Sequence, residues 1–115
     1  MRIIIFMLLA TGATAGSFLD NCEQTSLSLQ GSTLSALCTS DNKTATIDLN
    51  DCVYNSDSYL TCGRQTAYTD TCWGCWLPDD GTLRCQCLDT AHNQVWSQSV
   101  PLDSCLIYVN GGLAC

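Results

Sequence analysis

The cysteines of this 115-residue chain follow one pattern twice. Four cysteines in the first half are matched in order by four in the second half: Cys22, Cys38, Cys52 and Cys62 against Cys72, Cys87, Cys105 and Cys115. The residues around them repeat as well, because residues 47–53 resemble residues 100–106. The second copy is slightly longer, which indicates a short insertion. A unit duplicated at this period predicts a fold with internal pseudo-symmetry.

The amino terminus has the pattern of a secretory signal peptide. Met1-Arg2 is a short basic start, residues 3–10 are apolar, and Ala13-Thr14-Ala15 is a small-x-small cleavage signal. The apolar run is too short to span a bilayer, so we expect no membrane anchor. Residues 1–15 are therefore predicted to be removed. The remainder, 16–115, is predicted to be one secreted, extracellular domain with repeats at 18–66 and 67–115.

The charge of the chain excludes two classes of partner. Four basic residues stand against eleven acidic ones, which gives a formal net charge of −7. Nucleic-acid binding requires clustered Lys and Arg, and such clusters are missing from the sequence. An anionic membrane surface is disfavoured for the same reason. We expect neither nucleic acid nor a membrane as a partner.

Ten cysteines in an exported chain of this length indicate a framework of disulfide bonds. Turn-forming residues lie midway between several cysteines, as residues 78–81 do between Cys72 and Cys87. Residues that are equidistant from a turn face each other across a hairpin. On this basis the predicted bonds are Cys22–Cys38, Cys52–Cys62, Cys72–Cys87, Cys75–Cys85 and Cys105–Cys115.

The pattern of polar, apolar and turn-forming residues predicts an all-β fold. Residues 46–50 and 98–102 alternate between polar and apolar, as half-buried strands do. Turn-forming clusters recur at short intervals, which is typical of short antiparallel strands. No amphipathic helical stretch of convincing length is present.

These residues resemble the cyanovirin-N homology (CVNH) family of lectins. The resemblance covers residues 18–115 and is carried twice, by Asn21-Cys22, Ile47-Asp48-Leu49-Asn50 and Asn55-x-Asp57 in the first copy, and by Thr71-Cys72, Val100-x-Leu102-Asp103 and Asn110-Gly111 in the second. It implies two intertwined, pseudo-symmetric β-domains, each a triple-stranded sheet plus a β-hairpin, with strands exchanged between the repeats. It also implies a lectin that binds mannose-rich glycans or glycoproteins without a metal or other cofactor. We expect a monomer, with a domain-swapped dimer as the alternative.

The resemblance places two sugar-binding clusters on the chain. The main cluster contains Tyr54, Asn55, Ser56, Asp57, Asp70, Thr71, Asp89 and Thr90. The second, weaker cluster contains Asp20, Asn21, Thr39, Ser40, Asp41, Tyr108, Val109 and Asn110. Amide, carboxylate and hydroxyl groups held on rigid turns suit the hydroxyls of a sugar. The alternative is that Asn55, Asp57 and Asn110 only form turns, with side chains that bond to their own backbone.

Two departures from the family pattern bear on these clusters. Ser58 stands where the motif usually has Gly, and Tyr108 replaces the Asn of the second copy. The main cluster therefore keeps more of the pattern, and Tyr108 is expected to remodel or close the second one. Tyr54 and Tyr108 could alternatively stack on a sugar ring. We interpret the tryptophans, Trp73, Trp76 and Trp96, as core or edge-covering side chains rather than sugar platforms.

Catalytic and metal sites are not expected. Cys72-x-x-Cys75 with Cys85-x-Cys87 has the spacing of a zinc ribbon, but thiols in an exported chain are oxidised. His92 is the single histidine, and no nucleophile motif lies near it, so we predict a protein that is not an enzyme.

Asn42-Lys43-Thr44 is an N-glycosylation sequon, and we predict Asn42 as the acceptor. Two functions fit the sequence. The first is a secreted lectin. The second is a secreted, disulfide-rich effector or inhibitor that keeps the same fold but binds a protein. The losses of Gly at position 58 and of Asn at position 108 favour the second.

Overall fold

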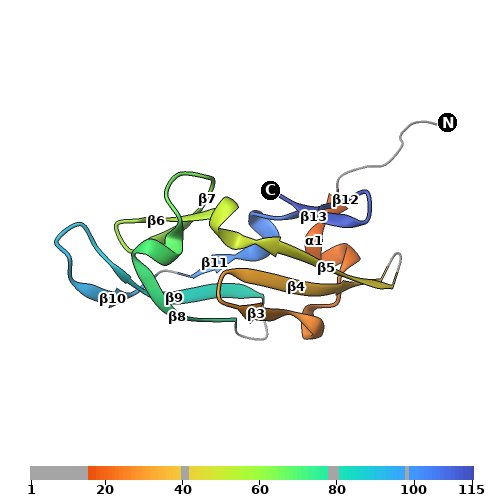
Figure 1. The fold of residues 1–115 in the computed structure, drawn as a ribbon, viewed down its shortest axis with the longest axis horizontal. Coiled ribbons are helices and arrows are strands. Elements are labelled where there is room, and N and C mark those ends of the chain that lie inside the picture. The colour runs from red at the N-terminus through yellow and green to blue at the C-terminus, as the bar shows by residue number, and fades with distance from the viewer. Residues whose placement is uncertain (1–15, 40–41, 78–80, 98) are drawn as a thin grey trace.

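A computed structural model describes residues 16–39, 42–77, 81–97 and 99–115, and it has the all-β fold expected from the sequence (Figure 1). The strands are β2 (Gly16–Ser17), β3 (Ser28–Gln30), β4 (Thr33–Cys38), β5 (Lys43–Asp48), β6 (Val53–Ser56), β7 (Tyr59–Cys62), β8 (Cys72–Trp76), β9 (Thr82–Leu88), β10 (Gln94–Trp96), β11 (Val100–Pro101), β12 (Ile107–Val109) and β13 (Gly112–Ala114). The short helical turns are α1 (Phe18–Asn21), η1 (Gln24–Ser26), η2 (Leu49–Asp51), η3 (Tyr68–Asp70) and η4 (Leu102–Ser104). No helix in the described part of the chain is long and apolar enough to cross a membrane.

The two repeats build the same sheet twice. In the first repeat, β4 lies between β3 and β5. In the second repeat, β9 pairs with β8 on one edge and with both β10 and β11 on the other. Ser97 joins these last two strands, because its N–H donates to the Cys85 carbonyl at 2.8 Å and its Oγ accepts from the Cys85 N–H at 3.1 Å. The second sheet is therefore also triple-stranded in outline, with its third strand interrupted at a buried serine.

Each repeat also contributes a two-stranded hairpin with a two-residue turn. In β6–β7 the turn residues are Asp57 and Ser58, with φ of 52° and 69°. In β12–β13 they are Asn110 and Gly111, with φ of 52° and 80°. Positive φ at both central positions defines a hairpin turn whose backbone twist matches the twist of the flanking strands. Asn, Asp and Gly adopt this conformation most readily. Ser58 occupies such a position without being one of those residues.

The hairpins are exchanged between the repeats. Figure 1 shows β6–β7 over the β8–β9 half of the molecule, and β12–β13 beside α1 and β5. Strand β12 pairs with β2, so the amino end of the described chain joins the last hairpin. A matched pair of contacts fastens this arrangement. Asn50 of η2 donates to Thr69 Oγ1 at 2.8 Å, and Asp103 of η4 accepts from the Leu19 N–H at 2.9 Å and the Ser17 hydroxyl at 2.6 Å.

The core lies between these layers and follows strand alternation. In β4 every second side chain is buried, and in β9 the same holds for Leu83, Cys85 and Cys87. Phe18 and Tyr68, which open the equivalent helical turns α1 and η3, are both fully buried. Because side chains of a strand point alternately to its two faces, this pattern leaves the opposite face of each sheet toward solvent.

Three of the five disulfides join the cysteines that the hairpin argument pairs: Cys22–Cys38, Cys72–Cys87 and Cys75–Cys85. The other two predicted bonds, Cys52–Cys62 and Cys105–Cys115, are wrong. The structure has Cys52–Cys115 and Cys62–Cys105, which join the two repeats.

The reason for the error is the length of the turn. The two-residue turn of β6–β7 pairs Val53 with Cys62, so Cys52 lies opposite Gly63 and points to the other face of the hairpin from Cys62. Two cysteines on opposite faces cannot bond to each other. Each instead meets a cysteine of the exchanged second hairpin.

A bulge in β8 allows a second disulfide, Cys75–Cys85, in the sheet of the second repeat. Cys72 pairs with Cys87, but the register shifts between Trp73 and Trp76, with Gly74 at a φ of 60°. The extra residue lets Cys72 and Cys75 both face the core, although they are three positions apart. Trp73 and Trp76 then face outward, together with Trp96, and their exposed fractions are 41, 49 and 50%. The interpretation of these rings as core side chains is therefore wrong, and an edge-covering role stays a prediction.

Candidate functional site

The tip of the β6–β7 hairpin meets the second repeat at the main predicted cluster. Asn55 Nδ2 donates to Thr71 Oγ1 and to the Leu88 carbonyl, both at 2.9 Å. Asn55 Oδ1 accepts from the Ser58 N–H at 2.8 Å and so closes its own turn. One half-buried amide therefore fixes the turn and ties it to the other repeat.

Asp57 makes a second connection beside the first. Its Oδ1 accepts from the Thr90 N–H at 2.9 Å and from the Thr90 hydroxyl at 3.1 Å. Both residues are exposed. The two bonds use the same carboxylate oxygen, Oδ1 of Asp57.

Asp89 shapes the loop that carries Thr90. Asp89 Oδ1 accepts from the N–H groups of Ala91 and Asn93 at 2.9 and 2.8 Å, and the Asp89 carbonyl accepts from the His92 N–H. His92 is an exposed loop residue with a φ of 63° and takes no part in the cluster. The turn 57–58 and the loop 89–93 are thus both set by side-chain bonds to backbone, which makes the surface rigid.

The remaining main-cluster residues divide into two groups. Asp70 is exposed at the end of η3, next to Thr71. Tyr54 and Ser56 alternate with Asn55 along β6, so their side chains point to the other face of the hairpin. The Tyr54 ring lies against Gly63, with Cε1 3.1 Å from the position that a Cβ would take there. The structure thus gathers Asn55, Asp57, Asp70, Thr71, Asp89 and Thr90 and directs Tyr54 and Ser56 away from them.

The second predicted cluster has the same backbone frame but different side chains. The Asn21 carbonyl accepts from the Thr39 N–H at 2.8 Å, just as the Thr71 carbonyl accepts from the Leu88 N–H in the other repeat at 3.0 Å. Asn21 Nδ2 turns inward and donates to the Ser17 carbonyl. Asp20 is exposed on α1, and Val109 and Asn110 lie at the hairpin turn. Ser40 and Asp41 lie outside the described residues.

Tyr108 stands in this second frame at the position that Asn55 holds in the first. It is 8% exposed and lies in β12 between β2 and β13. A buried phenol ring has no amide with which to bridge the two strands that Asn55 bridges. The second frame therefore has a buried aromatic ring at the position where the first has an amide.

Two hollows in the surface are lined by no residue of either cluster. One, of about 410 Å³, surrounds the inter-repeat disulfides and is lined by Asp51, Cys52, Cys62, Gly63, Arg64, Cys105 and Cys115. The other, of about 370 Å³, lies beside Trp73 and is lined by Leu29, Gly31, Thr69, Cys72, Trp73, Gly74 and Cys75. The main cluster is instead an open surface of turns.

In the described part of the chain, the cysteines and acidic residues offer no metal centre. Cys72, Cys75, Cys85 and Cys87 are all in disulfides, so the zinc-ribbon spacing is not used. Within the described ranges, no group of three or more His, Cys, Asp or Glu side chains is placed to hold a metal ion. Asn42, the predicted glycosylation acceptor, is exposed in the turn before β5.

The model of the CVNH domain matches residues 18–114 of the chain. The chain belongs to the CVNH family. Solved structures agree with this assignment. GzCVNH of Gibberella zeae has a TM-score of 0.72 at 20% identity, over 86% of this chain and 96% of that one. TbCVNH of T. borchii has a TM-score of 0.67 at 25% identity, over 85% of this chain and 97% of that one.

A variant of MoCVNH3, solved in complex with (N-GlcNAc)4, has a TM-score of 0.71 at 17% identity, over 90% of this chain and 99% of that one. No curated protein matches the chain in sequence. The family match and the solved structures therefore establish the fold, and membership of the CVNH family supports a carbohydrate-binding lectin.

Proposed function

We propose that this protein is a secreted lectin that binds mannose-rich glycans, without a metal, at the surface formed by Asn55, Asp57, Asp70, Thr71, Asp89 and Thr90. The observation that carries the proposal is the pair of side-chain connections across the repeats, from Asn55 to Thr71 and from Asp57 to Thr90. They hold exposed carboxylate and hydroxyl groups in one place before any ligand arrives.

Pre-organisation matters because each contact with a neutral hydroxyl is weak. A single hydrogen bond of this kind contributes only about 0.5–1.5 kcal/mol net, so several must converge. Groups that are already fixed lose little further entropy on binding, and more of their interaction energy remains as affinity. Asp57, Asp70 and Thr90 are exposed and lie on such fixed turns.

A glycan array with the mature protein tests the proposal. We expect binding to oligomannose structures, and the array should include oligomers of GlcNAc because the MoCVNH3 variant was solved with one. Silence across all glycans would contradict the proposal. Amino-terminal sequencing of the exported protein should find Gly16 as its first residue if residues 1–15 are a signal peptide.

The second candidate function is an effector or inhibitor that binds a protein on the same fold. The buried Tyr108, which stands where the first copy has Asn55, favours it, because a chain that bound glycans at both clusters would keep an amide there. This candidate would be supported by two results together: the protein binds no glycan on the array, and it captures one defined partner protein equally well after the partner's glycans are removed.

A further inference from the structure

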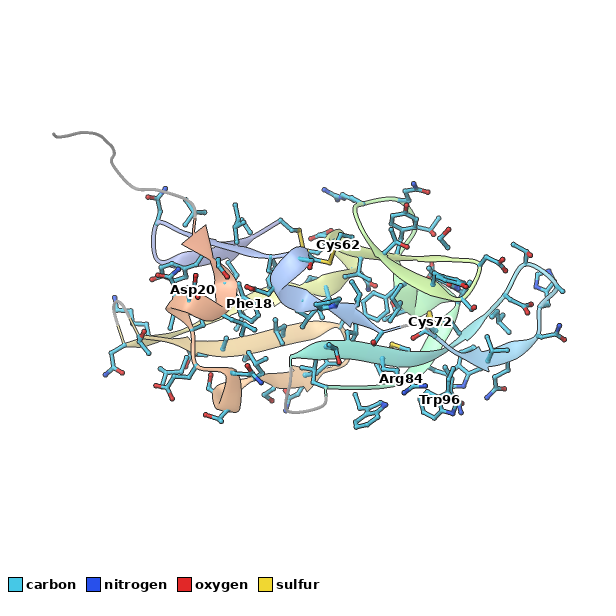
Figure 2. All side chains as sticks on the ribbon, turned by 180° about the vertical axis from the view of Figure 1, so that it is seen from behind. Phe18, Asp20, Cys62, Cys72, Arg84 and Trp96 are labelled. Atoms are coloured by element: carbon cyan, nitrogen blue, oxygen red, sulfur yellow. A yellow bond between two sulfur atoms is a disulfide. The ribbon has the colours of Figure 1, made fainter. Side chains whose placement is uncertain are left out.

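The outward face of the second sheet carries every tryptophan of the chain. Trp73 of β8, Gln86 of β9 and Trp96 of β10 are directly opposite one another in the strand register and form one row. Trp76 and Arg84 form the next row. Figure 2 shows Arg84 and Trp96 together at the edge of the molecule, with the Arg84 guanidinium 5.6 Å from the centre of the Trp96 ring. We call these five residues the tryptophan face.

The fold itself does not require these rings. In the first repeat the same register position pairs Leu37 with Thr44, where the second repeat pairs Gln86 with Trp96. Ser35 stands where the second repeat has Arg84. The first sheet has small or aliphatic side chains at these positions, so the fold alone does not account for the exposed rings of the second sheet.

The bulge in β8 is part of the same arrangement. The bulge turns Cys72 and Cys75 to one side of the sheet and Trp73 and Trp76 to the other. The disulfides Cys72–Cys87 and Cys75–Cys85 therefore lie on the side of the sheet opposite the tryptophan face. An exposed aromatic surface on a doubly cross-linked sheet is rigid. Large flat side chains with few rotatable bonds bind at low entropic cost.

We propose that the tryptophan face is a second carbohydrate-binding surface, which takes an extended oligosaccharide chain by stacking pyranose rings on Trp73 and Trp96. The two rings flank β9, so they are two strand spacings apart, or about 10 Å. That separation exceeds one pyranose ring and suits a chain of sugars rather than a monosaccharide.

The groups between the rings favour a neutral sugar over a protein. Tryptophan and arginine also mark protein interfaces, so the rings alone decide nothing. Here, however, the Gln86 amide lies between Trp73 and Trp96, and Gln94 Nε2 donates to Gln86 Oε1 at 2.7 Å, which orients both amides. A pyranose presents apolar C–H faces and a rim of hydroxyls, and it matches rings alternating with amides. Arg84 is the one charged residue of the tryptophan face, in a chain of net charge −7.

The test uses the mature protein and three soluble probes: hexaoses of β-1,4-linked glucose, β-1,4-linked GlcNAc and β-1,3-linked glucose. Tryptophan fluorescence and calorimetry should detect binding of at least one hexaose and none of free glucose. Trp73→Ala and Trp96→Ala should each weaken that binding by about tenfold, whereas Trp96→Phe, which keeps a ring, should lose less. Ile107→Ala is the matched control, because Ile107 is an exposed apolar residue of β12, outside the sheet that carries the tryptophan face.

The surface proposed for mannose is tested separately in the same series. Asn55→Ala/Asp57→Ala should leave hexaose binding unchanged, and the tryptophan variants should leave oligomannose binding unchanged. Failure of the wild type to bind any hexaose would overturn the inference, as would equal binding by the tryptophan variants. If these variants instead abolish self-association of the protein in sedimentation experiments, the face is a contact between copies of the chain and the inference is wrong.

Discussion

Asn55 and Tyr108 occupy the same position in the two hairpins, but Asn55 is half-buried and Tyr108 is buried. Asn55 reaches out of its hairpin and donates two hydrogen bonds to the other repeat, at Thr71 and Leu88. Tyr108 turns into the protein and is buried. The two equivalent positions of this duplicated fold therefore hold an amide that bonds to the other repeat in one hairpin and a buried ring in the other.

Replacing Asn55 and Asp57 together with Ala should weaken oligomannose binding by about tenfold or more. The physical reason is the loss of several converging hydrogen bonds, each worth about 0.5–1.5 kcal/mol. Calorimetric titration gives the affinity, and near-ultraviolet circular dichroism checks that the fold is intact. The control is Asn110→Ala, a substitution in the equivalent turn of the second cluster, and it should have little effect on oligomannose binding. Loss of binding only in the Asn110 variant would show that the sugar site lies at the β12–β13 hairpin and not at β6–β7.

Ser58→Gly should stabilise the protein by about 1 kcal/mol, because left-handed backbone costs a non-glycine residue about that much. Ser58 has a φ of 69°, and the second hairpin already has glycine, Gly111, at the equivalent position. Guanidinium unfolding at neutral pH measures the change. Gly111→Ser is the mirror-image control and should destabilise by a similar amount. Equal stability of Ser58→Gly and the wild type would mean that the turn holds no such strain.

Much of the fold could be predicted from the sequence because the repeat, the alternation and the turn residues are local signals. The pairing of Cys52 and Cys62 failed because one residue more or less in a turn reverses the face on which every later side chain lies. The outward position of Trp73 and Trp76 failed for a related reason. It depends on a bulge at Gly74, and strict alternation along the strand would not place both rings on one side.

The candidate site was predictable in its turn residues but not in its contacts. Asn55 and Asp57 stand out as an Asn-x-Asp turn, and the family resemblance placed Thr71 and Thr90 beside them. That Asn55 also donates to the Leu88 carbonyl could not be read from the sequence, since every residue has such an acceptor. The face used by Tyr54 follows from strand alternation once the turn length is known.

Non-reducing peptide mapping should recover the bonds Cys52–Cys115 and Cys62–Cys105. Removing the second with Cys62→Ser/Cys105→Ser should lower the free energy of unfolding by about 2–4 kcal/mol, because the bond restricts a long stretch of the unfolded chain. Its sequence separation is 43 residues, against 10 for Cys75–Cys85. Cys75→Ser/Cys85→Ser is therefore the control and should cost less. A peptide linking Cys52 to Cys62 would contradict the exchanged hairpins.

Tyr68→Phe should stabilise the protein, although it removes a polar group. The Tyr68 hydroxyl is buried and has no hydrogen-bond partner among the described residues, and a group in that state costs about 1–3 kcal/mol. Phe18, the equivalent residue of the first repeat, shows that a phenyl ring serves at this position. We expect a gain of about 1 kcal/mol near neutral pH.

The gain should grow at alkaline pH. Burial, and after it the nearby charge of Asp48, raises the pKa of Tyr68 to about 12, so the folded chain keeps the phenol neutral while the unfolded chain ionises it near pH 10. The raised pKa therefore means that the contribution of Tyr68 ionisation to the free energy of unfolding is fully present below pH 10 and is lost as pH rises from 10 toward 12. The variant lacks this loss. Guanidinium unfolding at pH 8 and pH 10.5 measures it, with Tyr59→Phe, at an exposed tyrosine, as the control. A variant that is less stable than the wild type at pH 8 would show that the hydroxyl has a partner.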